Sequence, residues 1–307
     1  MAELAQGKYI WKNGEFVAWQ DATTHILTHA LHYGTAVFEG MRCYKTDEGS
    51  AVFRLAEHME RLERSGRFIM MDLPYSASEL VDAAIELIRK NELESCYVRP
   101  IAYRGYGSMG VNPRPAPIDV AIAVWPWDAY LGAEAMENGL KAGISSWRQR
   151  SVNATPGAIK SSASYLNSGL AHMEAIDHGY GEAILLNESG QVAEGSGENI
   201  FAIKKGILKT PPLSDGVLEG ITRDSVIQLA RHFGFAVQEA SLARTDLYGA
   251  DEVFFTGSAA EVTPIANIDN RVIGNGKRGP ITEKLQAAFF EAVAGKIPEF
   301  KSWLYYV

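Results

Sequence analysis

The chain has 307 residues, of which 47% are hydrophobic and 21% charged, a composition that suits a globular protein with a sizeable core. A net charge of −8, with acidic and basic residues intermixed, excludes a basic surface that binds nucleic acid. Cys43 and Cys96 are the only cysteines, too few for a disulfide framework or a cysteine-based zinc site. No secretory signal pattern opens the chain and no apolar run reaches membrane-spanning length, so we expect a reduced, cytoplasmic protein.

The first part of the chain mixes short strands with helices. Asn13-Gly14 is a strong hairpin signal and predicts two short strands within 9–19. Ser76 and Glu79 form a capping box ahead of an amphipathic run, which predicts a helix ending near Lys90. Strands are further predicted at 35–45, 51–54, 95–104 and 119–125, and a helix at 56–70.

The first part ends near Trp127, and a new strand is predicted from Leu140. We expect a small first domain at 1–128, a linker at 129–138 and a larger second domain at 139–307. Hairpins mixed with helices, without regular β-α-β alternation, favour an α+β fold over a doubly wound sheet. Strands are predicted at 140–147, 183–187, 199–204, 251–256 and 262–269, and helices at 163–177, 222–233 and 281–294.

The segment Gly105-Tyr-Gly107-Ser-Met-Gly110 matches a dinucleotide-binding fingerprint after a predicted strand. That fingerprint needs a helix to begin directly behind it and receive the pyrophosphate. Prolines instead occupy three of the five positions from 113 to 117, which prevents such a helix. We therefore predict a loop here.

His25, His29 and His32 are spaced so that one helical face would present all three side chains. A metal site would also need a carboxylate or an open coordination position, and nothing independent predicts a helix in this segment. Chance clustering is the favoured explanation, and we predict no metal site.

Lys160 is surrounded by small and apolar residues within 153–165. An apolar pocket lowers the pKa of a lysine and frees its amine to attack a carbonyl carbon, although most lysines are solvated surface groups. Glu194 lies among glycines within 192–201, where a carboxylate can pair with a cationic ring nitrogen or simply occupy a surface turn. Each residue alone leaves both interpretations open.

Two further segments have the composition of anion-binding turns. Gly220 lies just ahead of the helix predicted from Thr222. The free backbone N–H groups of that helix start, with the Thr222 hydroxyl, suit a phosphate. The segment 256–260, Thr-Gly-Ser-Ala-Ala, ends a predicted strand and offers a second nest of amides and hydroxyls. Loops of this composition are common, so neither segment is specific by itself.

In combination and in this order, these segments resemble the fold-type-IV pyridoxal-phosphate enzymes, and among them the branched-chain amino-acid aminotransferases. The resemblance covers nearly the whole chain, from Ile10 to Phe290. The most specific matching strings are His29-Ala-Leu-His-Tyr33-Gly-Thr-Ala-Val-Phe38-Glu-Gly, Tyr97-Val-Arg99-Pro, Gly110-Val-Asn-Pro, Glu194-Gly-Ser-Gly-Glu-Asn, Gly220-Ile-Thr-Arg and Asp251-Glu-Val-Phe. Ser161-Ser162-Ala163-Ser164 departs from the more glycine-rich run of many relatives.

The resemblance implies pyridoxal 5'-phosphate as cofactor. Lys160 would form the Schiff base with it and shuttle the α-proton, while Glu194 would pair with the pyridine nitrogen and keep it protonated. Tyr165 would lie near the phenolic oxygen of the cofactor. The implied phosphate ligands are Arg61, Ile221, Thr222 and Ser258.

The resemblance also implies a substrate pocket. Tyr97 and Arg99 would let it accept the distal carboxylate of glutamate as well as an apolar side chain. The turn 256–259, including Ala259, would receive the substrate α-carboxylate through its amides. The remaining implied pocket residues are Tyr33, Phe38, Trp127 and Tyr130, together with Met109 and Val111 of a loop that covers the neighbouring subunit's pocket.

The implied protein has a smaller N-terminal α/β domain and a larger C-terminal pseudo-barrel domain with the cofactor between them, and it is at least a homodimer. Its reaction is a reversible ping-pong transfer between L-leucine, L-isoleucine or L-valine and 2-oxoglutarate. D-amino-acid aminotransferases, R-selective amine transaminases and aminodeoxychorismate lyases would also keep Lys160, Glu194 and Arg61, but the segment 97–99 and the loop 107–111 favour the branched-chain type. A non-catalytic phosphate-binding protein is the alternative from another class.

Overall fold

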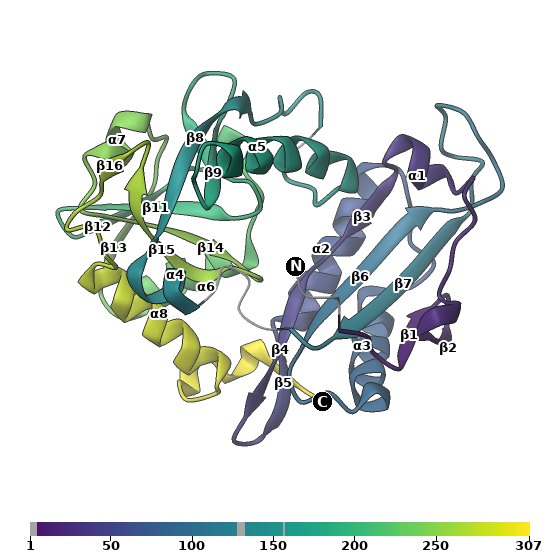
Figure 1. Ribbon diagram of the computed structural model, residues 1–307. Helices are drawn as coiled ribbons and strands as arrows, with labels where there is room; N and C mark the ends of the chain where they lie inside the picture. The colour runs from purple at the N-terminus through teal and green to yellow at the C-terminus, as the bar shows by residue number, and fades with distance from the viewer. Residues whose placement is uncertain (1–4, 128–132, 156) are drawn as a thin grey trace. The chain divides into compact units, whose positions relative to one another are not determined.

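The computed structural model describes residues 5–127, 133–155 and 157–307, and it confirms the prediction of an α+β fold (Figure 1). The chain divides into two compact units. The first consists of Met1–Asp128, Ile159–Ala163 and Ala292–Val307, and the second of Ala129–Ala158 and Ser164–Glu291. The first unit therefore includes two segments that the sequence assigned to one continuous domain at 139–307.

The first unit is built on a sheet of eight strands among the described residues, in the order β17-β5-β4-β6-β7-β1-β2, with β3 paired to β6. Every pairing in this sheet is antiparallel. The strands are β1 (Tyr9–Lys12), β2 (Glu15–Ala18), β3 (Ala36–Phe38), β4 (Met41–Thr46), β5 (Gly49–Phe53), β6 (Cys96–Arg104), β7 (Ile118–Trp125) and β17 (Leu304–Tyr306). The helices are α1 (His29–Tyr33), α2 (Leu55–Phe68) and α3 (Ala77–Asn91), with short 3-10 turns at Trp19–Asp21 and Pro298–Trp303.

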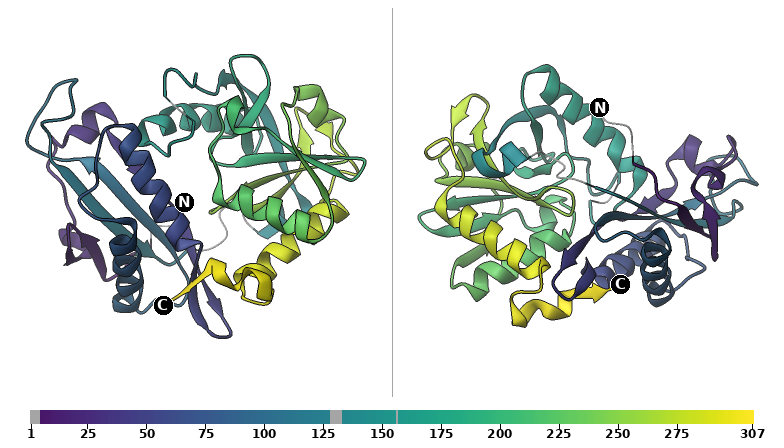
Figure 2. Two further views of the ribbon diagram at one scale, coloured as in Figure 1. Left: turned by 180° about the vertical axis from the view of Figure 1, so that it is seen from behind. Right: turned by 60° about the horizontal axis from the view of Figure 1, so that its bottom comes forward.

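Helices α2 and α3 pack against each other and against this sheet (Figure 2). The side chains of Leu62, Leu87 and Val98 are fully buried in the shared core, whose removal from water stabilises the unit. The capping box is confirmed, because Ser76 Oγ accepts from the backbone N–H of Glu79 and the Glu79 carboxylate accepts from the N–H of Ser76.

One strand prediction in this unit was wrong. The run predicted as a single strand at 35–45 is divided into β3 and β4, which are separated by Glu39 and Gly40. A Cβ atom on Gly40 would lie 2.0 Å from the Tyr97 hydroxyl, so any other residue here would have to displace the Tyr97 ring. The side chain of Glu39 is completely buried and turns to α2, as described below.

The second unit is built on a sheet of nine strands among the described residues, in the order β10-β9-β8-β15-β14-β11-β12-β13, with β16 paired to β15. This sheet is mixed, since β8 pairs in parallel with both β9 and β15, and β12 pairs in parallel with β13. The strands are β8 (Leu140–Arg148), β9 (Glu182–Leu186), β10 (Val192–Gly195), β11 (Asn199–Lys204), β12 (Ile207–Thr210), β13 (Ala236–Glu239), β14 (Glu252–Gly257), β15 (Glu261–Ile268) and β16 (Arg271–Val272).

The helices that follow residue 132 are α4 (Ala133–Asn138), α5 (Tyr165–Asp177), α6 (Ile221–His232), α7 (Arg244–Tyr248) and α8 (Pro280–Val293), with 3-10 turns at Ser162–Ser164 and Leu213–Asp215. Helix α4 occupies part of the segment 129–138 that was expected to be a linker, and its sequence Ala-Glu-Ala-Met-Glu-Asn consists largely of strong helix formers.

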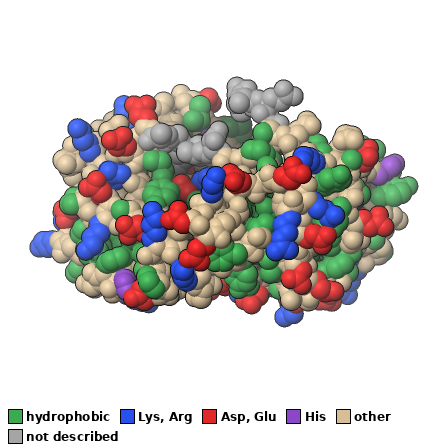
Figure 3. Space-filling model, turned by 90° about the horizontal axis from the view of Figure 1, so that it is seen from below, with side chains coloured by type: hydrophobic (Ala, Val, Ile, Leu, Met, Phe, Trp, Pro, Cys, Tyr) green, Lys and Arg blue, Asp and Glu red, His purple; other side chains and the backbone are tan. Residues whose placement is uncertain are grey.

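The loop predicted in place of a dinucleotide fingerprint is confirmed, because residues 105–117 contain neither helix nor strand. None of the helices in the described residues has the length and apolarity needed to cross a bilayer. On the face shown in Figure 3, basic and acidic side chains are interspersed rather than gathered into patches of one sign.

Candidate active site

The backbone of Lys160 is fixed on both sides by the first unit. Its carbonyl oxygen accepts a hydrogen bond of 3.0 Å from the N–H of Phe38, and its own N–H donates to Ser65 Oγ of α2 at 3.4 Å. The next residue, Ser161, forms a bridge with Val37, and its hydroxyl donates to the carbonyl of Ala36 at 3.2 Å. The lysine segment is thereby held against β3 in one position.

The Lys160 side chain lies beside a group of aromatic residues that surround Arg99. Lys160 Nζ lies 5.3 Å from the centre of the Phe38 ring, and the Arg99 guanidinium lies 5.0 Å from the same ring. Arg99 also faces the rings of Tyr97 at 5.2 Å and Trp125 at 5.8 Å. Trp127 completes the group, with its ring centre 4.8 Å from that of Tyr97.

Buried donors in this aromatic group lack hydrogen-bond partners among the described residues, including Arg99 Nε and Trp125 Nε1. A buried N–H without an acceptor costs free energy, so such donors are expected to meet an acceptor supplied by water or by a ligand. The predicted pocket residues Phe38, Tyr97, Arg99 and Trp127 are therefore brought together, with a cation set among apolar rings.

Arg61 forms a buried cluster with two residues that the sequence did not single out. Its Nε and a terminal nitrogen donate to the two oxygens of Glu39 at 2.6 and 2.8 Å, and His58 Nδ1 lies 2.7 Å from Glu39 Oε2. Burial by itself raises the pKa of Glu39, but the charge and hydrogen bonds of Arg61, together with the contact to His58, outweigh it and hold that pKa far below its usual range. Glu39 is thus an ionised carboxylate that orients Arg61.

His58 lies between this ion pair and the lysine. Its pKa is lowered, chiefly by burial, and the charges of Arg61 and Lys160 act in the same direction, against the carboxylate of Glu39. His58 is therefore a neutral ring within a cluster of fixed charges.

A second group of predicted residues is built around His29. This fully buried ring packs against Tyr33 at 4.5 Å, its Nδ1 lies 2.8 Å from Thr35 Oγ1, and its Nε2 lies 2.8 Å from the carbonyl oxygen of Gly110. His29 thereby anchors the loop that carries Met109 and Val111, both of which are exposed, Val111 to 88%. Within the described residues, no group of His, Cys, Asp or Glu side chains is arranged to hold a metal ion.

In the second unit, Glu194 of β10 is held by three donors. Its Oε1 accepts from Gln149 Nε2 at 2.5 Å, and its Oε2 accepts from the backbone N–H of Leu218 at 3.0 Å and from Asn199 Nδ2 at 3.2 Å. Hydrogen bonds to the charged form of a carboxyl group favour ionisation. The arrangement can hold a negative charge in a defined position.

Asn199 connects this carboxylate to the start of α6. Its Nδ2 also donates to the carbonyl of Leu218 at 3.0 Å, and a Cβ atom on Gly220 would lie 1.9 Å from its Oδ1. Gly220 is the N-cap of α6, so Ile221 and Thr222 occupy the first helical positions, where backbone N–H groups suit an anion.

Asn199 also connects the end of β14 to the start of α6. Asn199 pairs with Thr256 across β11 and β14, and Ser258 and Ala259 follow in a turn. The Thr256 hydroxyl is buried and has no hydrogen-bond partner among the described residues. Asn199 therefore links Glu194 to the start of α6 and to the end of β14. The predicted residues Ile221 and Thr222 begin α6, and Ser258 and Ala259 follow β14.

Tyr165 opens α5, beside a half-buried cation, Arg150, that sequence reasoning missed. Arg150 donates to the carbonyl of Ser164, and its charge interacts with Glu194 and Tyr165. Burial lowers the pKa of Arg150, while these two groups raise it. Tyr130 lies outside the described residues, so the structure gives no position for it.

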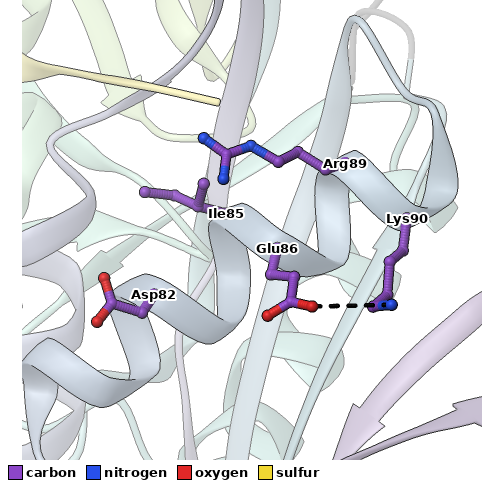
Figure 4. A pocket seen from close by; sticks show the side chains of 5 residues that line it. All are labelled: Asp82, Ile85, Glu86, Arg89 and Lys90. Carbon is purple, nitrogen blue, oxygen red and sulfur yellow. Dashed lines mark ion pairs between the residues drawn. The ribbon is translucent and has the colours of Figure 1, made fainter.

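Of the residues that the sequence missed, Glu39 and Asn199 lie inside motifs quoted above, which is a usable signal, whereas nothing in the sequence around Gln149 marks it. A shallow hollow on the exposed side of α3 contains none of the predicted residues (Figure 4). It is lined by Asp82, Ile85, Glu86, Arg89 and Lys90, with an ion pair of 3.7 Å between Glu86 and Lys90, and we assign it no function.

Comparison with known proteins identifies the family to which this chain is similar in sequence and in structure. Residues 36–268 match the model of the family described as amino-transferase class IV. A branched-chain-amino-acid aminotransferase of Salmonella typhimurium is 48% identical over 297 residues, which cover 96% of each chain. The structure of a T.th. branched-chain amino acid aminotransferase with pyridoxamine 5'-phosphate superimposes with a TM-score of 0.95 at 47% identity, covering 98% of this chain and 99% of that one. Its complex with N-(5'-phosphopyridoxyl)-L-glutamate gives 0.94 at 46% identity, with the same coverage.

Proposed function

Because the chain belongs to the class IV amino-transferase family, we propose that it is a branched-chain-amino-acid aminotransferase that uses pyridoxal phosphate. It transfers the amino group of L-leucine, L-isoleucine or L-valine to 2-oxoglutarate, and the products are the branched-chain 2-oxo acid and L-glutamate. The observation in the molecule that carries this proposal is the fixed Lys160 segment beside Phe38 and the Arg99 group.

The residues present fit pyridoxal phosphate chemically. The Glu194 carboxylate, held by three donors, suits the ring nitrogen, and the start of α6 with the unsatisfied Thr256 hydroxyl suits the phosphate. When bound, this cofactor supplies a carbonyl carbon that takes up the amino group and a ring that accepts the electron pair of the broken Cα–H bond. We assign its phosphate to Arg61, Ile221, Thr222 and Ser258, and its phenolic oxygen to Tyr165.

We assign two tasks to Lys160. Its Nζ is the amine that holds the cofactor, and once the substrate amine has replaced it, Nζ accepts the Cα proton and later returns a proton. A proton shuttle must keep its amine at hydrogen-bonding range, and the backbone contacts to Phe38 and Ser65 support this by limiting the motion of the lysine.

We assign substrate discrimination to the aromatic group around Arg99. The rings of Phe38, Tyr97 and Trp127 offer an apolar wall for a branched side chain, and the buried Nε of Arg99 offers a donor to the distal carboxylate of glutamate. Tyr33 is assigned to the same wall. The amides of the turn that contains Ala259 are assigned to the substrate α-carboxylate.

We further propose that the protein is at least a homodimer. Exposed apolar side chains of the first unit cluster in sequence around α1 and the loop 105–111, and contiguous exposed apolar surface of this kind marks an interface. The loop residues Met109 and Val111 are assigned to the partner's substrate pocket. The exposed apolar residues are Ile26, Leu27, Leu31, Tyr33, Tyr106, Met109 and Val111. Two buried free thiols, Cys43 and Cys96, support a reducing compartment, the cytoplasm.

The proposed function is tested by the visible spectrum of the protein loaded with pyridoxal phosphate. We expect the absorption of the bound cofactor to change on addition of L-leucine alone and to return on addition of 2-oxoglutarate. A response to D-alanine or an R-amine, without a response to L-leucine, would assign a sister activity instead. A protein that binds no pyridoxal phosphate would refute the proposal.

A further inference from the structure

The environment of Glu194 contains a residue that belongs to none of the motifs discussed above. Gln149 follows β8 directly, 45 positions before Glu194, and its side chain donates to Glu194 Oε1. Gln149 is 6% exposed, so its amide is desolvated. A buried glutamine that touches a functional carboxylate is a candidate for controlling the state of that carboxylate.

The orientation of the Gln149 amide follows from its partners. Its nitrogen contacts two acceptors, Glu194 Oε1 at 2.5 Å and the carbonyl oxygen of Gly216 at 3.3 Å. A flipped amide would place its oxygen against both acceptors, which is unfavourable. The backbone N–H of Gln149 donates to the carbonyl of Leu186 at 2.8 Å, so the residue is fixed to β9, the partner strand of β10, which carries Glu194.

We propose that Gln149 is a positioning residue, which keeps Glu194 ionised and oriented so that the cofactor's ring nitrogen stays protonated. This inference rests on the proposed pairing of Glu194 with that nitrogen. The two groups share one proton, and its location depends on which group holds it more strongly. A hydrogen bond donated to the carboxylate weakens the affinity of Glu194 for the proton, so the proton stays on the ring.

Other charged and polar groups near Glu194 do not replace this contribution. Arg150 interacts with it through charge, and Asn199 and the N–H of Leu218 donate to the opposite oxygen, Oε2. Removal of the Gln149 amide would leave those contacts in place and change the environment of Oε1. Loss of the donor and loss of orientation both move the shared proton away from the ring nitrogen.

The test uses Gln149→Met, which keeps approximately the length of the side chain and removes the donor. The protein is loaded with pyridoxal phosphate labelled with ¹⁵N in the ring, and the ¹⁵N chemical shift is followed against pH. We expect the signal of the variant at neutral pH to move toward the unprotonated position. The kcat for L-leucine should fall by about tenfold, the size of a one-unit change in proton affinity, with KM almost unchanged.

The matched control is Gln286→Met. Gln286 is a glutamine of α8 that is 4% exposed, and its side-chain nitrogen donates to the carbonyls of Val262 and Met136 rather than to Glu194. The control variant should leave the ¹⁵N signal at the wild-type position, whatever its effect on stability. If Gln149→Met does not fold, Gln149→Asn keeps an amide but withdraws it by one methylene, and it should move the signal in the same direction.

Glu194→Gln separates the failure of this inference from failure of the underlying role. If Glu194→Gln moves the ¹⁵N signal and the folded Gln149 variant leaves both signal and kcat at wild-type values, the role of Gln149 is refuted while that of Glu194 stands. If Glu194→Gln itself leaves the signal unchanged, the pairing of Glu194 with the ring is refuted, and the inference falls with it.

Discussion

The carbonyl oxygen of Lys160 accepts a backbone hydrogen bond of 3.0 Å from Phe38, a residue 122 positions earlier at the end of β3. The lysine therefore belongs to the first unit, although the residues on both sides of its short segment belong to the second. The aromatic ring beside Lys160 Nζ is part of the same residue that fixes its backbone. Phe38 thus fixes the backbone of Lys160 and also provides an apolar surface beside its amine.

Arg99→Met should separate the two substrates of the proposed reaction. We expect kcat/KM for 2-oxoglutarate to fall by about 10- to 100-fold, the value of a charge-assisted hydrogen bond, while kcat/KM for 4-methyl-2-oxopentanoate, the oxo acid of leucine, changes by less than about threefold. Steady-state kinetics with each oxo acid measures this. Arg89→Met, on the exposed side of α3, is the control and should change neither value. Equal losses for both oxo acids would contradict the assigned role of Arg99.

Glu39→Gln should destabilise the first unit. Glu39 is a fully buried carboxylate, and its substitution leaves Arg61 and His58 without their charged partner, which costs about 3–5 kcal/mol for a buried pair. Denaturant unfolding of the cofactor-free protein measures the loss. Glu57→Gln is a matched control, because Glu57 of α2 pairs with Arg54 at 2.8 Å but is partly exposed, and we expect it to cost less than about 1 kcal/mol. Similar losses in the two variants would refute the role of Glu39.

His172 and Glu182 should make stability depend on pH. Glu182 is fully buried, and its Oε1 lies 3.1 Å from His172 Nδ1, while its Oε2 has no hydrogen-bond partner among the described residues. The hydrogen bond and charge of Glu182 raise the pKa of His172 above 6.5, against the opposing effect of burial. The protonated ring therefore stabilises the fold, fully below pH 6.5, and this contribution is lost as the pH rises through the elevated pKa.

The measurement compares thermal unfolding of wild type and His172→Asn across this pH range. The variant should be less stable than wild type at acidic pH and should approach it at alkaline pH, with a difference below about 1 kcal/mol because solvent screens the partly exposed ring. A difference that is constant with pH, or that grows as the pH rises, would contradict the account.

Val111→Asp should weaken the proposed dimer. The side chain of Val111 is 88% exposed in the chain, so a carboxylate there does not disturb the fold but opposes burial at an interface. Sedimentation velocity should show an increased monomer fraction at low micromolar concentration. Val272→Asp replaces a valine of β16 that is 63% exposed, and it should leave the association unchanged. A wild-type protein that is monomeric at all concentrations would refute the assembly.

Elements with local signals were predictable from the sequence. Asn13 and Gly14 both adopt positive φ, at 49° and 93°, as the turn of the β1–β2 hairpin requires, and the Ser76–Glu79 capping box begins α3 as predicted. These signals depend on side chains that act within a few residues of their own backbone. The bounds of α2, α6 and α8 agree with the predicted helices to within two residues.

Long-range relationships were not predictable in the same way. Nothing around Lys160 indicates that its segment joins β3, since the pairing depends on residues more than a hundred positions away. The buried pairing of Arg61 with Glu39 and of Gln149 with Glu194 likewise arises only when separate elements pack. The resemblance identified the candidate residues, and the structure adds the neighbours that orient them.

Lys160 holds the cofactor in the proposed function, and reduction of the loaded protein with sodium borohydride tests this assignment most directly. Reduction fixes a pyridoxyl group permanently on whichever amine holds it, and mass spectrometry of the digested protein locates that residue. We predict that the added mass lies on the peptide containing Lys160 and that Lys160→Ala carries none. A modification that remains at another lysine in wild type, with Lys160 unmodified, would contradict the account.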